Sequence, residues 1–420
     1  MNQNSTAAPG SQVTIIGAGV VGMATAVQLQ DAGYAVTVID RLPPGEAASF
    51  GNAGGMPTSH AFPLGLPGMA AKIPGWLTDP LGPLALRWSY LPRLAPWLAR
   101  FVRASSAENA GKSFESILTL MRDSKTDWQP LLDAAGIADL VQPVGGVVPY
   151  RSEAALDADA AMWRMPRQHG LNVQRLSRDE LRQLEPTLNE AYSCAMFEPD
   201  WQRALDPHAV VVGLAEHFAR RGGTLLREQV ADIETGPNGV HALRTNQGVR
   251  SVENLVVCAG AWSHKIAARL GSKVPLEACR GYHIVLPDPG RMPRNMVFPP
   301  EFSCAITPMR MGLRFAGTAE FAGLNSEPNW GRARKLTQVA KSVFPGISVE
   351  GYTEWAGDRP IIPDSLPVID RSPHHRNVVF AFGHAFYGLT LGAATGKLVT
   401  EIVDGRPPSA DLSPYRVTRF

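Results

Sequence analysis

The stretch that decides the fold is Val13-Thr14-Ile15-Ile16-Gly17-Ala18-Gly19-Val20-Val21-Gly22. A short apolar, β-branched run is followed at once by three closely spaced glycines and then by an amphipathic stretch through Ala32, a pattern that predicts a strand, a tight turn and a helix. Gly33 ends that helix, and residues 35–39 form a second apolar strand that ends in Asp40. The stretch therefore predicts a βαβ unit.

The glycines of this unit match the requirements of a dinucleotide site. We expect Gly17 to permit the turn, Gly19 to let backbone amides approach a pyrophosphate, and Gly22 to let the helix and the strand pack closely. The helix N-terminus then faces the phosphate charge. Asp40 follows Gly22 by about 18 residues, near the spacing at which an acid accepts hydrogen bonds from a ribose. NAD and FAD both satisfy this unit, and a glycine turn without a ligand is the alternative.

Three later segments favour FAD over a nicotinamide cofactor. The small-residue loop Ser49-Phe50-Gly51-Asn52-Ala53-Gly54-Gly55 exposes amides that can lie along a planar ring system. Residues 255–262 predict a buried strand that turns sharply into a helix, and residues 383–396 predict a turn that enters a helix. Nicotinamide enzymes seldom need such a loop after the first βαβ unit.

Together these motifs resemble the D-amino acid oxidase and dehydrogenase family of FAD-dependent enzymes, and most of all its bacterial D-amino acid dehydrogenases and hydroxyproline-catabolism relatives. The motifs stand in family order: N-A-G at 52–54, A-G-A-W at 259–262, G-D-R-P at 357–360 and G-H-x-x-x-G-x-T-L-G at 383–392. The resemblance covers nearly the whole chain.

The resemblance implies an α/β fold in which a Rossmann-like FAD-binding domain is interleaved with a substrate-binding domain built on a mostly antiparallel sheet. A chain of 420 residues exceeds the size of a single core, which agrees with two domains. The FAD-binding domain is expected at 12–60, 200–270 and 350–420, and the substrate-binding domain at 61–199 and 271–349. Within the first, Asp206-Pro207 is a helix start, and Gln229-Val230 is placed like the segment that meets the adenine in relatives.

The resemblance also implies which residues bind a non-covalent FAD. They come from the glycine motifs and the segments around them: Gly17, Gly19, Val20, Val21, Gly22, Asp40, Arg41, Ser49, Asn52, Ala53, Gly54, Gly55, Val230, Ala259, Gly260, Trp262, Arg359, Gly383, His384, Tyr387, Gly388, Leu389 and Thr390. The helix that begins near Gly388 is expected to point its N-terminus at the flavin pyrimidine ring. No cysteine lies in that region, so a cysteinyl flavin link is not expected there.

Arg359 is the candidate for binding a substrate carboxylate, because a planar guanidinium can grip both oxygens at once. It precedes Pro360, which biases it toward an extended conformation at a strand edge. By resemblance, G-D-R-P corresponds to the G-L-R-P of relatives, whose arginine binds the carboxylate. Asp358 replaces the usual leucine, and an arginine paired with a surface acid is the alternative.

Further candidates are one tyrosine and three histidines. Tyr282 and His283 lie on a predicted strand, where alternation sends them to opposite faces, and Tyr282 is favoured for the pocket. His384, in the last motif, is expected near the flavin, with a structural role as its alternative. His60, just past the small-residue loop, is a weaker candidate. No metal site is expected, since the adjacent His374-His375 are not spaced to bind one ion.

Composition and charge narrow the environment of the protein. Its residues are 45% hydrophobic and 19% charged with a net charge of +2, which predicts a globular chain without nucleic acid as a partner. The four cysteines are widely spaced, and the polar first twelve residues lack a positive signal region, so a cytoplasmic protein is expected. The proline-rich segment 62–103 contains a stripe of Leu94, Ala95, Leu98 and Phe101 that suggests peripheral membrane contact, with a helix packed on its own domain as the alternative.

The sequence therefore predicts an enzyme that dehydrogenates the carbon–nitrogen bond of a D-amino acid or an imino acid with FAD and passes electrons to a quinone or a dye. D-Proline, cis-4-hydroxy-D-proline and secondary amines such as sarcosine all fit as substrates. Oxygen as the acceptor, a NAD-dependent dehydrogenase, and a nucleotide-binding regulator or membrane adaptor without turnover are the alternatives.

Overall fold

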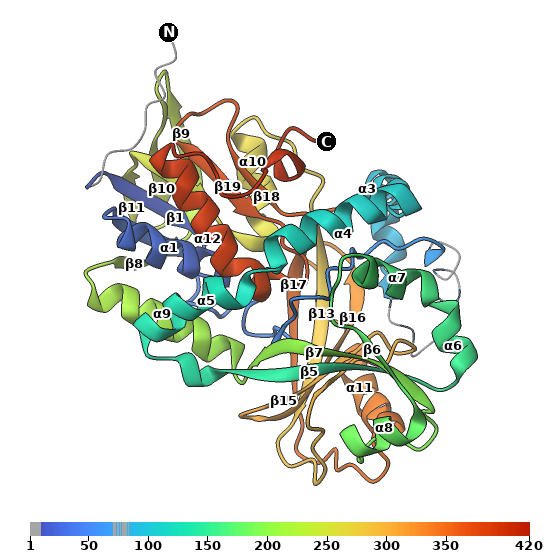
Figure 1. Ribbon diagram of the computed structural model, residues 1–420. Coiled ribbons are helices and arrows are strands. Elements are labelled where there is room, and N and C mark those ends of the chain that lie inside the picture. The colour runs from blue at the N-terminus through green and yellow to red at the C-terminus, as the bar shows by residue number, and fades with distance from the viewer. Residues whose placement is uncertain (1–9, 70–72, 74, 76, 78–81, 83) are drawn as a thin grey trace.

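The computed structural model describes residues 10–69, 73, 75, 77, 82 and 84–420. Two β-sheets organise these residues into an upper and a lower part, and long strands of the lower sheet extend toward the upper part (Figure 1). Both parts mix helices with strands, so the predicted α/β class with mixed sheets is confirmed.

The upper part is built on a six-stranded sheet. Its order is β18-β19-β12-β1-β2-β8, and all neighbours are parallel except β18 and β19. The strands are β1 (Gln12–Ile16), β2 (Ala35–Asp40), β8 (Thr224–Arg227), β12 (Asn254–Val257), β18 (Val368–Arg371) and β19 (Val378–Phe382). Every one of them falls inside a range that the sequence assigns to the FAD-binding domain, because buried parallel strands read as continuous apolar runs.

Helices from the two ends of the chain cover one face of this sheet. In Figure 1, α1 (Val20–Asp31) and α12 (Gly388–Asp404) lie side by side. A Cβ atom at Gly396 would lie 2.6 Å from Gln28 Nε2 and 3.1 Å from the backbone of Ala24, so this glycine lets the two helices touch. Gly396 therefore serves the contact between α12 and α1.

Other elements border the upper part. Helix α9 (Pro207–Arg220) begins as predicted, with Asp206 Oδ1 accepting hydrogen bonds from the amides of His208 and Ala209. A separate antiparallel sheet consists of β9 (Val230–Gly236), β10 (Gly239–Thr245) and β11 (Gly248–Ser251). Val230 therefore starts an edge strand.

The lower part is a larger, mostly antiparallel sheet with the order β17-β13-β16-β15-β14-β5-β7-β3. Two short strands join it at the side, β4 on β16 and β6 on β7. The strands are β3 (Gly55–Met56), β4 (Leu84–Leu86), β5 (Val141–Tyr150), β6 (Gln174–Leu176), β7 (Cys194–Ala204), β13 (Glu277–Leu286), β14 (Met296–Val297), β15 (Ala305–Met309), β16 (Gly312–Phe321) and β17 (Thr353–Ile361). Helix α11 (Trp330–Val343) packs on β13, β16 and β17.

The division of the chain departs from the expected boundaries in two places. Strands β3 and β17 lie in ranges expected for the FAD-binding domain but pair within the larger sheet. Helices α4 (Ala107–Met121) and α5 (Ser124–Ala135) lie in a range expected for the substrate-binding domain but pack against α12. Apolar patterns locate elements, but they do not state which sheet an element joins.

Three more helices lie on the lower part, and one lies beside the upper sheet. Residues 153–168 form two helices, α6 (Glu153–Ala158) and α7 (Ala160–Gln168), because Asp159 between them leaves the helical conformation. Helix α8 (Arg178–Leu184) starts with a capping box between Ser177 and Glu180. Helix α10 (Ser263–Arg269) follows the short turn 260–262.

The segment 62–103 ends in helix α3 (Leu91–Ala104). Leu94, Trp97 and Phe101 are buried against the protein, whereas Ala95 of the predicted stripe is exposed. This packing favours a helix that lies on its own protein. Pro74, Trp76, Pro80 and Pro83 of the segment lie outside the described residues. Within the described part of the chain, no helix is both long and apolar enough to cross a bilayer.

The close packing of α1 on the first turn gives a testable prediction. A Cβ atom at Gly22 would overlap the carbonyl oxygen of Gly17, so Gly22→Ala should lower the free energy of unfolding by about 1–3 kcal/mol. Gly111→Ala is the matched control, since no atom lies within 4 Å of its Cβ position in α4, and alanine there should stabilise by about 0.5–1 kcal/mol. Urea unfolding measures both, and equal shifts would contradict the prediction.

Candidate functional site

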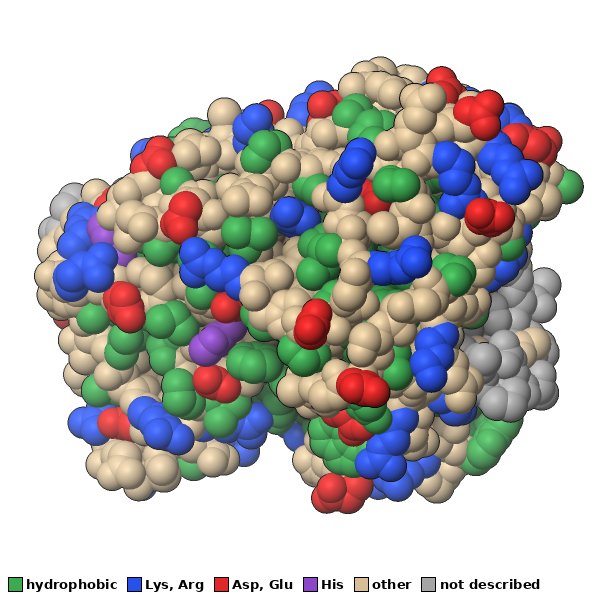
Figure 2. All heavy atoms as spheres, turned by 90° about the horizontal axis from the view of Figure 1, so that it is seen from below, with side chains coloured by type: hydrophobic (Ala, Val, Ile, Leu, Met, Phe, Trp, Pro, Cys, Tyr) green, Lys and Arg blue, Asp and Glu red, His purple; other side chains and the backbone are tan. Residues whose placement is uncertain are grey.

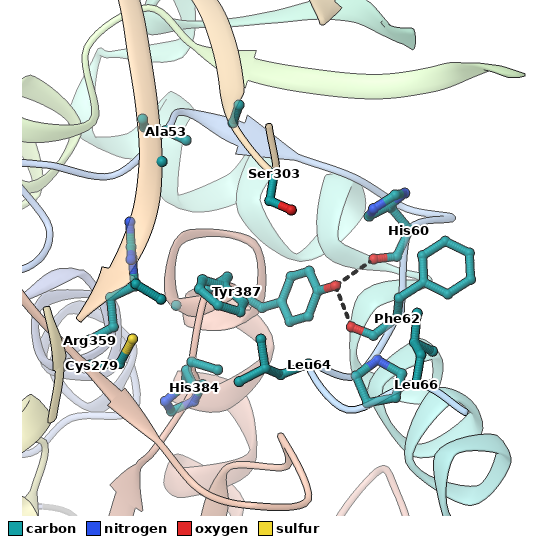
Figure 3. A pocket seen from close by; sticks show the side chains of 18 of the residues that line it. Ala53, His60, Phe62, Leu64, Leu66, Cys279, Ser303, Arg359, His384 and Tyr387 are labelled. Atoms are coloured by element: carbon teal, nitrogen blue, oxygen red, sulfur yellow. Dashed lines mark hydrogen bonds between the residues drawn. The ribbon is translucent and has the colours of Figure 1, made fainter. Parts of the chain in front are cut away.

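One cavity of about 1180 Å³ lies where the upper part meets the larger sheet. Its walls bring together the glycine segments that the sequence singles out (Figure 3). The sequence-predicted residues that line it are Gly19, Val20, Val21, Ser49, Asn52, Ala53, Gly55, Gly260, Arg359, Gly383, His384, Tyr387, Gly388 and Leu389. Five segments that are separate in sequence, around positions 20, 52, 260, 359 and 386, therefore meet around one space.

The N-termini of two helices open onto this cavity. Val20 begins α1 and Gly388 begins α12, and neither helix has an acidic residue in its first turn. Each terminus presents backbone amides and partial positive charge. One end of the cavity thus suits a phosphate and the other a ring that accepts hydrogen bonds or carries negative charge. This arrangement fits a flavin dinucleotide.

Several sequence-predicted residues do not line the cavity. These are Gly17, Gly22, Asp40, Arg41, Gly54, Val230, Ala259, Trp262 and Thr390. Gly17 has a φ of 115°, which lets the chain turn against Cys258. Asp40 accepts hydrogen bonds from the amides of Ala18 (2.7 Å) and Leu42 (2.9 Å). Its carboxylate therefore braces the glycine turn.

Arg41 and Trp262 lie together beside the cavity. The guanidinium carbon of Arg41 is 4.0 Å from the centroid of the Trp262 ring, a cation–π contact. This contact joins the end of β2 to the turn that follows β12. Trp262 of the A-G-A-W motif and Arg41, the residue after Asp40, therefore meet in space although they are far apart in sequence.

The small-residue loop is held from both sides. Ser49 Oγ accepts a hydrogen bond from the Val20 amide at 3.0 Å, and Asn52 Oδ1 accepts one from the Gly54 amide at 2.8 Å. From the larger sheet, Thr307 Oγ1 donates to the Ala53 carbonyl at 2.7 Å. These bonds fix the loop backbone at the cavity wall, and none of them uses a charged side chain of the loop.

Arg314 on β16 is a residue that sequence reasoning missed. Its Nη1 donates to the carbonyls of Phe50 (3.2 Å) and Asn52 (2.6 Å), and the side chain is buried. Burial lowers its pKa to about 10. The sequence offered one signal for such a residue, because Arg314 is a lone charge between Leu313 and Phe315 on an apolar strand. A charge in such a place requires a specific partner, and here the partner is the loop backbone.

Arg359 lies on β17 and its guanidinium crosses Gly281 of β13, where a Cβ atom would overlap the guanidinium carbon. Its Nη1 donates to the Thr318 carbonyl at 3.1 Å. Burial lowers the pKa of Arg359. Among the described residues it makes no ion pair, because the neighbouring Asp358 pairs instead with Arg280, Oδ1 to Nε at 3.1 Å. A half-buried guanidinium without an ion-pair partner among the described residues therefore faces the cavity.

Neither Tyr282 nor His283 lines the cavity, which corrects the preference for Tyr282. The Tyr282 hydroxyl donates to Glu320 and accepts from the Asn329 amide, on the side of the sheet that α11 covers. His283 points the other way, but its ring stacks on Trp355 at 5.0 Å, so Trp355 lines the cavity in its place. The two side chains point to opposite faces of the sheet, as alternation predicts. Alternation does not predict whether another residue covers a side chain and keeps it out of the cavity.

His384, Tyr387 and His60 all line the cavity. Burial lowers the pKa of His384 to about 3, and its Nε2 forms a hydrogen bond of 2.9 Å with Thr395 Oγ1. The Tyr387 hydroxyl donates to the carbonyls of His60 and Phe62, each at 2.8 Å (Figure 3). Burial raises the pKa of Tyr387. His384 and Tyr387 are therefore neutral groups that shape the wall.

Two cysteines also line the cavity. Burial raises the pKa of Cys258 to about 12 and that of Cys279 to about 11. Both thiols are protonated at neutral pH and are poor nucleophiles. This chemistry agrees with a cofactor that is bound without a covalent link.

The chain is similar to a known family and to several named proteins. It matches the family DAO, described as FAD dependent oxidoreductase, over residues 12–402. It is 37% identical to a D-amino-acid oxidase of Bradyrhizobium diazoefficiens, covering 98% of this chain and 99% of the relative. It is 31% identical to a D-amino acid dehydrogenase of Paramagnetospirillum magneticum, covering 97% and 99%.

Solved structures share the fold. Glycine oxidase from Geobacillus kaustophilus superposes with a TM-score of 0.74 at 24% identity, covering 97% of this chain and 98% of that one. L-proline dehydrogenase from P. horikoshii superposes with a TM-score of 0.75 at 19% identity, covering 99% and 98%. At these identities the likeness establishes the architecture.

The buried histidines predict how stability depends on pH. Burial lowers the pKa of His283 to about 3, compared with about 6.5 in an unfolded chain. Between these values the unfolded state binds a proton that the folded state does not, so stability is complete above pH 6.5 and falls as the pH falls. Removing this histidine in His283→Phe should reduce the slope of unfolding free energy near pH 5 by about 1.4 kcal/mol per pH unit. Urea titrations from pH 4 to 7 measure it, and parallel curves would refute it.

Proposed function

Because the chain belongs to the DAO family of FAD-dependent oxidoreductases, we propose that it dehydrogenates a D-amino acid or a D-imino acid at Cα. The family excludes the NAD-dependent alternative as its main chemistry. FAD, when bound, would supply the acceptor for the hydride that leaves Cα. The relatives named D-amino-acid oxidase and D-amino acid dehydrogenase support the choice of substrate class.

The observation that carries this proposal is the half-buried guanidinium of Arg359, which lines the cavity. It donates a hydrogen bond to the Thr318 carbonyl, and no described residue forms an ion pair with it, so its remaining N–H groups can bind an anion. The cavity side of Arg359 is therefore the place for a carboxylate, which a guanidinium binds through two parallel hydrogen bonds. The bond from Arg359 to the Thr318 carbonyl fixes the rotation of the guanidinium, so the carboxylate is oriented as well as bound.

The surroundings of Arg359 also favour the reactive form of the substrate. The wall around it is mostly apolar, with Phe386 5.5 Å from the guanidinium carbon and the neutral thiol of Cys279 nearby. A poorly hydrated site disfavours an ammonium group and so favours the neutral amine, which can release a hydride from Cα. In this proposal Arg359, held by the Thr318 carbonyl, positions the substrate carboxylate, and the apolar wall excludes water.

We propose that FAD binds without a covalent link along the sequence-predicted segments. Gly19, Val20 and Val21 would contact the pyrophosphate, with Asp40 bracing the turn and able to reach a ribose. The N-terminus of α12 would face the pyrimidine ring. The six-stranded sheet would then be the core of the FAD-binding domain and the larger sheet that of the substrate-binding domain.

We propose a quinone or an artificial dye as the electron acceptor, on the strength of the relatives named dehydrogenases. Oxygen is the second candidate, favoured by the 37% identical relative named an oxidase. A cytoplasmic location is part of the same proposal. On the face shown in Figure 2, basic and acidic side chains intermix, which agrees with a partner other than nucleic acid.

Arg359→Ala should retain FAD but raise KM for amino acids at least about 100-fold, because two charge-assisted hydrogen bonds are lost. Arg359→Lys keeps the charge but cannot form two parallel hydrogen bonds to the carboxylate, so its KM should lie between those of wild type and Arg359→Ala. Arg334→Ala, which removes an exposed partner of Glu354, is the control and should match wild type. Visible flavin absorbance measures the FAD content, and steady-state dye reduction measures KM. An unchanged KM in Arg359→Ala would remove this residue from the site.

Anaerobic bleaching of the flavin with pairs of enantiomers tests the substrate class. The D-enantiomers of alanine, leucine and proline should bleach the flavin, and the L-enantiomers should bleach it at least about 100-fold more slowly, because with the carboxylate on Arg359 and the Cα hydrogen toward the flavin, an L-enantiomer would exchange the places of the amine and the side chain. Bleaching by L-enantiomers alone would overturn the stereochemistry. Bleaching by neither, in a protein whose flavin dithionite reduces, would overturn the function.

A further inference from the structure

An aromatic compartment occupies the end of the cavity opposite Arg359. In Figure 3, Arg359 and His60 lie on opposite sides of Tyr387. Around the His60 ring are four aromatic rings that also line the cavity, with centroids 4.7–6.3 Å away: Phe62, Trp163, Trp201 and Phe298. This compartment is wide, flat-walled and apolar, with the imidazole as its central polar group.

A buried carboxylate holds the His60 ring in place. Glu198 is fully buried, and its Oε1 lies 2.8 Å from His60 Nδ1 while its Oε2 accepts a hydrogen bond of 2.6 Å from Ser59 Oγ. An ionised carboxylate only accepts hydrogen bonds, so Nδ1 of His60 carries the proton. In a neutral imidazole the other nitrogen, Nε2, is then an acceptor.

The accepting nitrogen is open to the cavity. The His60 side chain is 18% exposed, and Nε2 makes no hydrogen bond to any residue that the structure describes. Because this nitrogen is not a buried atom, it is accessible to a ligand. A hydrogen-bond acceptor that lines an aromatic compartment suits a ligand that is itself an aromatic ring with an N–H or O–H group at its edge.

We propose that the compartment binds the side chain of the substrate and selects aromatic D-amino acids whose ring carries a hydrogen-bond donor, such as a phenol or an indole. This inference rests on the proposed function, because Arg359 anchors the carboxylate at the other end. An extended aromatic amino acid bound there points its ring away from the guanidinium. His60 is then a specificity-determining residue, and Glu198 is the positioning residue that sets its tautomer.

The test compares substrates that differ in a single hydrogen-bond donor. For the wild-type holoenzyme, kcat/KM should be about tenfold higher for D-tyrosine than for D-phenylalanine, and higher for D-tryptophan than for its 1-methyl derivative. These two comparisons need no variant, so they remain decisive even if a substitution impairs folding. Ratios near one in both pairs would overturn the proposal.

Variants separate selection from general damage. In His60→Phe both ratios should fall to about one, because the acceptor is replaced by a ring of similar shape. Trp163→Leu opens the aromatic compartment and should lower kcat/KM for all four aromatic substrates relative to D-alanine. Thr187→Val, which deletes a buried hydroxyl outside the cavity, is the control and should leave both ratios unchanged. Preserved ratios in His60→Phe would contradict the role of His60.

The outcome also distinguishes this inference from the proposed function. If D-alanine and D-leucine reduce the flavin but the donor-bearing rings gain no advantage, only the inference about the compartment fails. If no D-amino acid reduces a flavin that dithionite reduces, the proposed function fails and the inference fails with it.

Discussion

The organisation of the site follows from one electrostatic feature, the half-buried guanidinium of Arg359, which faces the cavity without an ion-pair partner among the described residues. The fold directs Asp358, the nearest acid in sequence, to Arg280 on the neighbouring strand. Alternation along β17 puts residues 358 and 359 on opposite faces, so a structural ion pair and a ligand-binding cation can be adjacent in sequence. The same cavity receives the N-termini of α1 and α12, which also favour negative charge. Three sources of positive potential thus converge on one space.

Much of this arrangement could be predicted from the sequence because its motifs act locally. The glycines of the first turn, the apolar strands beside them and the N-cap at Asp206 each constrain only their neighbours, and the structure has each of them where it was expected. Family order of the later motifs then predicted that residues 49–55, 260 and 383–389 would meet. Arg359 was identifiable because a guanidinium before a proline at a strand edge matches a known motif.

The remainder depends on pairings between distant segments, which no local pattern records. Tyr282 and His283 were correctly placed on opposite faces, but α11 covers one face and Trp355 the other, and only the assembled sheet shows this. Arg314 acts through carbonyl groups of a loop more than 260 residues away in the chain. The role of His60 depends on Glu198, whose position opposite the small-residue loop follows from the pairing of β3 with β7.

The contact of α1 with α12 has a consequence for biosynthesis. Strand β1 needs β12 as a neighbour, and the glycine at position 396 contacts helix α1 only after the segment that contains it has been synthesised. During vectorial synthesis β1 and α1 therefore emerge long before their partners, and their apolar surfaces stay uncovered in the meantime. A cofactor that needs both helices can bind only after α12 has formed. Chaperone demand before that point and the supply of flavin after it, more than the local stability of α1, would then set the yield of active enzyme.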